Sequence, residues 1–159
     1  MTRIEKLLKE LYNSVFGDHL HGASAVEILM GITVKQAVQK PISSAHNIID
    51  LTLHITAWTE EVLSRLNGNN PSEPQMGDWP IPENYSNEYW TSAKQHLFEA
   101  TNKLISIIQE FPEEMLDKTI SGERDVSLGT GFSFEELIMG LVQHNAYHLG
   151  QISLLKKFS

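Results

Sequence analysis

The sequence predicts an all-α fold: an antiparallel four-helix bundle with short extra helices in the first connection. Apolar residues recur every three or four positions in four long segments, which is the spacing of one helix face. Serine followed three residues later by glutamate, the pattern of a capping box, opens two of the helical segments. No strand-rich segment competes with this interpretation, and 159 residues fit a single domain over residues 1–159.

The first third of the chain predicts one long helix and two short helical pieces. The first helix covers about residues 3–15 and ends at Gly17. Its apolar face consists of Ile4, Leu7, Leu8, Leu11 and Val15. Ser24 and Glu27 open a short helix, and residues 33–39 form another piece before a proline.

A second long helix and a long loop follow. Ser43 or Ser44 is expected to begin the helix, which reaches about Leu66 and is terminated by an Asn-Gly pair. Residues 68–85 contain four prolines and no helical period, so we expect a loop. Loops of this length are often lids or site walls, and Met76 and Trp79 are the lid candidates.

The last part of the chain predicts two more long helices. Ser86 begins the third, and Phe111-Pro112 ends it. Residues 117–131 are polar and include a candidate short hairpin. Ser133 and Glu136 open the last helix, which runs to about Lys157.

Composition excludes several classes of function. The net charge of −8 repels phosphate, so we expect no nucleic-acid partner. No apolar run approaches the length needed to cross a bilayer, and nothing directs the chain elsewhere, so we expect a cytoplasmic protein without a membrane partner. Zero cysteines exclude disulfides, thiolate metal sites and cysteine nucleophiles. A metal must therefore be held by histidine, aspartate or glutamate.

Polar residues interrupt the expected core-facing stripe of the last helix. The stripe consists of Leu137, Leu141, His144, His148, Gln151 and Leu155. Buried polar side chains each cost about 1–3 kcal/mol when they lack partners, so something must satisfy the two imidazoles. His144 and His148 are one turn apart and can converge on one ion; the alternative is a hydrogen-bonded core pair.

A third ligand must come from another helix. His54 lies between Leu51 and Trp58 at helical spacing and is the preferred ligand. Asp50 is a substitute for it, and His46 is less favoured.

The other histidines and Gln151 have less direct interpretations. His96 is expected at an edge, and His19 and His21 are expected to be solvated loop residues. Gln151 is a candidate to bind a metal-bound water or orient a ligand; the alternative is a buried amide bonded to a neighbouring helix. Trp58 and Tyr147 are expected to be packing residues rather than residues that stack on a substrate.

Known metal motifs narrow the chemistry. The chain lacks the Glu-x-x-His repeats of di-iron bundles and the His-Glu-x-x-His of zincins. Three neutral imidazoles with open positions are a catalytic arrangement, and imidazole suits zinc, nickel, copper and iron. The residues do not choose among these metals; our working assignment is a divalent zinc or nickel ion, with manganese or iron as alternatives.

Two histidine motifs resemble those of the DinB-like superfamily. The segment HNAYHLGQI at residues 144–152 resembles its last-helix motif, H-x-x-Y-H-x-G-Q-I, and residues 41–58 resemble its second-helix motif. Gly-Asp-Trp-Pro at residues 77–80 and the His21-Gly22 pair are similar to its YfiT-like branch. The chain departs from the second-helix motif at Ile49 and Asp50, where an aromatic residue and a glutamate are common.

The resemblance implies a four-helix bundle whose divalent metal is held by His54, His144 and His148, and it implies a homodimer. Some members of the superfamily are metal-dependent transferases that use bacillithiol, mycothiol or glutathione. Our first hypothesis is therefore S-transfer of such a low-molecular-weight thiol to an electrophilic small-molecule substrate. Because the chain has no cysteine, the thiol must be a second substrate.

Two alternatives remain open. The first is a metal-dependent hydrolase that uses a metal-bound water, with Asp50 or Glu61 as candidate general base. The second is a non-catalytic metal- or ligand-binding module, which a closing fourth ligand from Asp50 or His21 would favour. Asp50 and Gln151 are thus the catalytic candidates beside the three metal ligands.

Overall fold

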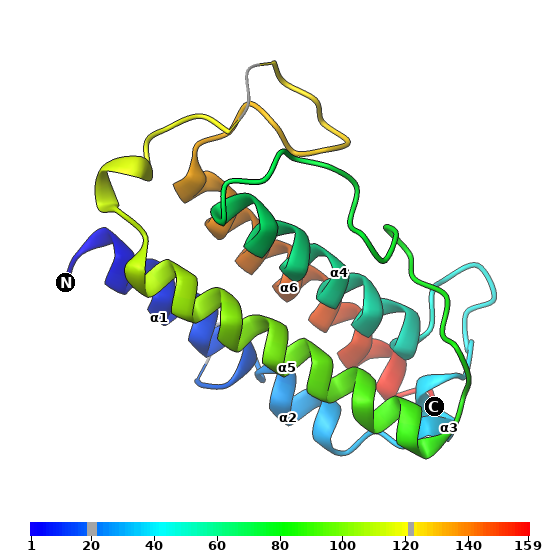
Figure 1. Ribbon diagram of the computed structural model, residues 1–159. Helices are drawn as coiled ribbons and strands as arrows, with labels where there is room; N and C mark the ends of the chain where they lie inside the picture. Colours follow the sequence, from blue (N-terminus) through cyan, green and yellow to red (C-terminus); the bar gives the residue numbers. More distant parts are fainter. Residues whose placement is uncertain (19–21, 121–122) are drawn as a thin grey trace.

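The computed structural model describes residues 1–18, 22–120 and 123–159 and is helical, with four long helices (Figure 1). The helices of the described residues are α1 (Arg3–Val15), α2 (Ala25–Met30), α3 (Val34–Ala37), α4 (Ile48–Leu66), α5 (Asn87–Glu110), the 3-10 turn η1 (Glu113–Met115) and α6 (Phe134–Lys156). The four long ones pack side by side, and α4 and α1 each contact both α5 and α6. The all-α bundle is therefore confirmed.

The helix directions differ from a simple antiparallel bundle. Helices α4 and α5 run in the same direction, because the connection over residues 67–86 returns along the length of the bundle (Figure 1). Helix α6 runs opposite to α4. This long crossover lies against α4, so the loop covers the helix that carries His54.

Capping boxes define most helix starts. The boxes predicted at Ser24 and Ser133 are present, and Ser86 caps α5 as expected. The predicted start of α4 at Ser43 or Ser44 is wrong, because Asn47 caps the helix and forms a reciprocal box with Asp50. Asparagine is as good a cap as serine, so this later box determines the start.

Two apolar clusters fill the bundle. One lies among α2, α4, α5 and the end of α6, and the other lies among α1, the end of α4, the end of α5 and the start of α6. The most buried face of α6 is centred on Ile138, Asn145 and Ile152, so the predicted stripe borders the core rather than filling its centre. Because the stripe lies at the edge of the core, its histidines stand between the apolar core and a cavity.

The segment before α6 forms a single antiparallel bridge between Thr119 and Ser133. Ile120 donates its backbone N–H to Phe132 at 2.8 Å and accepts from Gly131 at 3.2 Å. The candidate hairpin is thus reduced to one bridge, and the described ranges contain no strand. Within those ranges, none of the helices combines the length and apolar character that crossing a membrane requires.

Candidate metal centre

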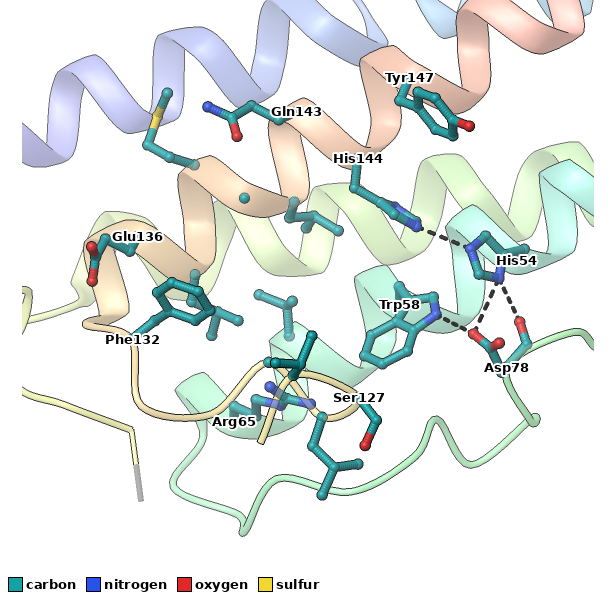
Figure 2. Close-up of a pocket in the computed structure, with 18 of the residues that line it drawn as sticks. His54, Trp58, Arg65, Asp78, Ser127, Phe132, Glu136, Gln143, His144 and Tyr147 are labelled. Atoms are coloured by element: carbon teal, nitrogen blue, oxygen red, sulfur yellow. Dashed lines mark hydrogen bonds and ion pairs between the residues drawn. The ribbon is translucent and has the colours of Figure 1, made fainter. Parts of the chain in front are cut away.

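Three imidazoles converge between two helices. His54 comes from the middle of α4 and points toward His144 of α6 (Figure 2). His148 lies one turn further along α6. One nitrogen from each ring lies within 4.8 Å of the other two. The Nε2 atoms of His54 and His144 are 3.0 Å apart. The sequence prediction that these three side chains meet is confirmed.

Burial keeps the three imidazoles neutral. His54 and His148 are 5% and 7% exposed, and burial lowers the pKa of both rings. The pKa of His144 falls from 6.5 to about 4, first through burial and then through the two neighbouring imidazoles. Neutral imidazole is the form that binds a metal ion, so the site needs no proton release at neutral pH.

Hydrogen bonds at Nδ1 orient two of the rings. His54 Nδ1 lies 2.5 Å from the carbonyl oxygen of Asp78, and a carbonyl only accepts, so Nδ1 carries the proton. His148 Nδ1 donates to Gln151 Oε1 at 2.7 Å. Both rings therefore present an Nε2 lone pair for binding. Gln151 is bonded to a histidine on its own helix, not to a neighbouring helix.

The donor set fits a cation. His54 Nε2 and His144 Nε2 face each other at 3.0 Å, and His54 has no proton there to donate. His144 Nδ1 is buried and has no partner within the described part of the chain. A divalent ion held by the three histidines would accept the Nε2 lone pair of each ring. This is the donor set of a three-histidine metal site. Only these three side chains form such a cluster among the described residues.

The long loop completes the wall of the site. Asp78 Oδ1 accepts a hydrogen bond from Trp58 Nε1 at 2.7 Å and lies 3.4 Å from His54 Nδ1 (Figure 2). Trp79 stacks on the His54 ring with the centroids 3.9 Å apart. Sequence reasoning proposed Trp79 as part of a lid but missed Asp78. The Gly-Asp-Trp-Pro run was the available signal, because it places a carboxylate beside that tryptophan.

Other sequence candidates lie outside the triad. Asp50 accepts a hydrogen bond from the backbone N–H of Asn47, the cap of α4, and its Oδ2 lies 3.8 Å from His46 Nδ1 and 4.0 Å from Lys40 Nζ. His46 stacks on the opposite side of Trp79, at 3.5 Å, and does not join the cluster. His96 bonds to Glu60 at 2.7 Å, as an edge residue would.

Two further expectations concern Glu61 and the first connection. Glu61, the other candidate general base, is buried, and it accepts hydrogen bonds from Arg65 at 3.0 Å and from the backbone of Ser72 at 2.9 Å. It is therefore already paired. His19 and His21 lie outside the described residues.

A cavity of about 730 Å³ opens on the triad. Its walls come from α4, α6, the loop at Asp78 and residues 126–132, and they are mainly apolar. Trp58 lines this cavity, and Tyr147 stands at it with 66% of its surface exposed, so Tyr147 is not the packing residue we expected. The size and lining are those of a pocket for a small organic molecule.

Comparison with known proteins identifies a family. The family model described as the DinB superfamily matches residues 19–152, a range that includes both histidine-bearing helices up to Ile152. Neither the curated proteins nor the solved structures gave a significant match.

Proposed function

The chain belongs to the DinB superfamily, and on this premise we propose that it is a metal-dependent enzyme that transfers a low-molecular-weight thiol to an electrophilic small molecule. The observation that carries the proposal is the convergence of three neutral imidazoles beside an apolar cavity. His54, His144 and His148 would hold the ion, with zinc or nickel favoured.

A divalent ion bound there supplies Lewis-acid chemistry, lowering the pKa of a thiol so that the nucleophilic thiolate is present at neutral pH. Three neutral ligands support this role because they leave the positive charge of the ion undiminished. In the overall reaction a sulfur–carbon bond forms and the bond from that carbon to its leaving group breaks. The leaving group departs with the electron pair and the thiol proton is released.

Asp78 is the carboxylate of the cavity wall that contacts the triad, so we assign it as the acceptor of that proton. Its Oδ1 is held by Trp58, whereas Oδ2 has no hydrogen-bond partner in the described ranges. Asp78 also lines the cavity next to His54. The apolar walls would hold the electrophile and exclude water, which competes with the thiol. The chain offers no cysteine of its own, so the sulfur must come from a soluble thiol.

Cobalt substitution tests the proposal. The cobalt-loaded protein is titrated with glutathione or bacillithiol while its absorption spectrum is recorded. We expect a sulfur-to-cobalt charge-transfer band that saturates with thiol in the wild type and is absent in His148→Ala. A wild-type protein that binds cobalt but shows no such band with either thiol would exclude these two thiols as ligands of the site and contradict the proposal.

Asp78 also favours a second candidate function, hydrolysis. A carboxylate next to the triad is positioned to act as general base toward water. The test is turnover of an activated ester by the zinc-loaded protein without any thiol. Hydrolysis that is lost in Asp78→Asn and kept in Asp50→Asn would support this function, since Asp50 lies at the start of α4 and does not line the cavity. No turnover above that of free zinc would contradict it.

A further inference from the structure

The cavity is elongated along two antiparallel helices. Arg65 follows His54 by eleven residues on α4, which is about 16 Å along the helix axis. Both residues line the cavity, so it extends from the histidine triad to the end of α4. The walls between these ends are mainly apolar; they include Trp58, Val62, Leu137 and Leu141.

Arg65 is a buried cation with an unused donor group. The residue is 2% exposed. Its Nε donates to Glu61 at 3.0 Å, and its Nη2 donates to the carbonyl oxygen of Ser72 at 3.4 Å. No acceptor contacts Nη1 among the residues that the structure describes, although this nitrogen carries two of the five guanidinium protons. Because Arg65 lines the cavity, this charged donor is available to a ligand there.

The surroundings of Arg65 fix its position. Glu61 is held by Ser72 through both the backbone N–H and the hydroxyl group, so the carboxylate is anchored to the long loop. Gly129 lies beside Nη1, and a Cβ atom at this glycine would be 3.8 Å from it. Gly129 also lines the cavity, so no side chain projects from this position next to the guanidinium.

A purely structural ion pair explains the geometry less well. Such a pair is stable when the guanidinium donors are satisfied, and two parallel bonds from arginine to one carboxylate are its usual form. Here only Nε contacts Glu61, and Arg65 is one of the residues that line the cavity (Figure 2).

We propose that Arg65 anchors the far end of an elongated, mainly apolar ligand by donating to a neutral carbonyl oxygen. This inference rests on the proposed function in one respect: the reacting end of the ligand lies at the histidine triad. A neutral acceptor is favoured over a carboxylate because Glu61 already balances the charge of Arg65. The substrate class is then an apolar electrophile with a ketone, ester or amide group remote from the reacting carbon.

The experiment compares two probes of equal chain length, octanamide and octylammonium. Binding to metal-free protein is followed by tryptophan fluorescence, because Trp58 lines the cavity. We expect octanamide to bind roughly tenfold or more tightly than octylammonium. A hydrogen bond to a charged donor changes a dissociation constant by about this factor. The net charge of −8 favours the ammonium probe, so it works against the expected preference.

Variants test whether the preference for octanamide depends on Arg65. In Arg65→Gln the preference should disappear, whereas Lys94→Gln, which removes a cation on α5 that does not line the cavity, should keep it. If Arg65→Gln alone melts below assay temperature, the double variant Glu61→Gln, Arg65→Gln avoids the unpaired buried carboxylate. Equal binding of the two probes by the wild type, or a preference that survives removal of Arg65, would overturn the inference.

Zinc titration of the same samples separates this inference from the proposed function. Wild type and Arg65→Gln should bind zinc equally, because Arg65 is not in the triad. Zinc binding without a preference for octanamide contradicts the role of Arg65 alone. A preference for octanamide without zinc binding contradicts the proposed function but leaves the carbonyl subsite intact.

Discussion

Acidification should destabilise the metal-free protein before its carboxylates titrate. The pKa of His144 falls from 6.5 to about 4 on folding, mainly through burial. Between these values the unfolded chain binds a proton that the folded chain does not, so stability falls as pH falls. The contribution of neutral His144 to the free energy of unfolding is complete above about pH 6.5 and is lost progressively toward about pH 4. At 1.36 kcal/mol per unit, His144 alone should cost about 2 kcal/mol at about pH 5.

The assay is urea denaturation in the presence of a chelator at about pH 7, 6 and 5, for the wild type and for His144→Gln. The pKa of His54 and of His148 is also lowered, so the wild type should lose more than the contribution of His144 alone. The free energy of unfolding of the variant should fall by roughly 1 kcal/mol less per pH unit. Without the His144 imidazole, the unfolded chain binds one proton fewer as the pH is lowered. A wild-type free energy of unfolding that is unchanged between about pH 7 and 5, or equal slopes for both proteins, would refute the reasoning.

Three further predictions concern single side chains. Gln151→Leu should weaken zinc binding by roughly 10–100-fold in a competitive titration, because it removes the acceptor that orients His148; an unchanged affinity would show that this bond is dispensable. Leu104→Ala should lower the free energy of unfolding by about 2–5 kcal/mol, because the side chain is buried in the core, while leaving the zinc stoichiometry of the folded protein unchanged. Trp58→Phe should cost about 1 kcal/mol in urea denaturation, because the bond to Asp78 is lost; no measurable loss would contradict a stabilising role.

Local signals in the sequence were sufficient for most helices and for the histidine triad. Capping boxes and helical periodicity depend only on neighbouring residues, so the starts at Ser24, Ser86 and Ser133 are predicted correctly. The histidines of α4 and α6 border the apolar faces of their helices, and two such faces pack against each other in a bundle. The meeting of His54 with the last helix therefore follows from the sequence pattern. The start of α4 was misplaced because several residues before it could serve as caps, and only Asn47 has its box partner at the correct spacing.

The parts contributed by the loops were not predictable in the same way. Asp78 reaches His54 only because the long loop returns along α4, and no periodicity in residues 68–85 encodes that path. Glu61 and Arg65 have the spacing of an ordinary exposed ion pair on one helix, so nothing local indicates that Ser72 and the loop bury them. The fold follows from local patterns, whereas the walls of the cavity depend on tertiary contacts.

The central claim is that three imidazoles from α4 and α6 hold one metal ion. Elemental analysis of protein purified without an affinity tag, beside the His148→Ala variant prepared identically, tests it most directly. We expect about one divalent ion per chain in the wild type and a large loss of metal in the variant. A wild-type protein that contains no metal and takes up none on incubation with zinc or nickel, or a variant that retains the full amount, would contradict the claim.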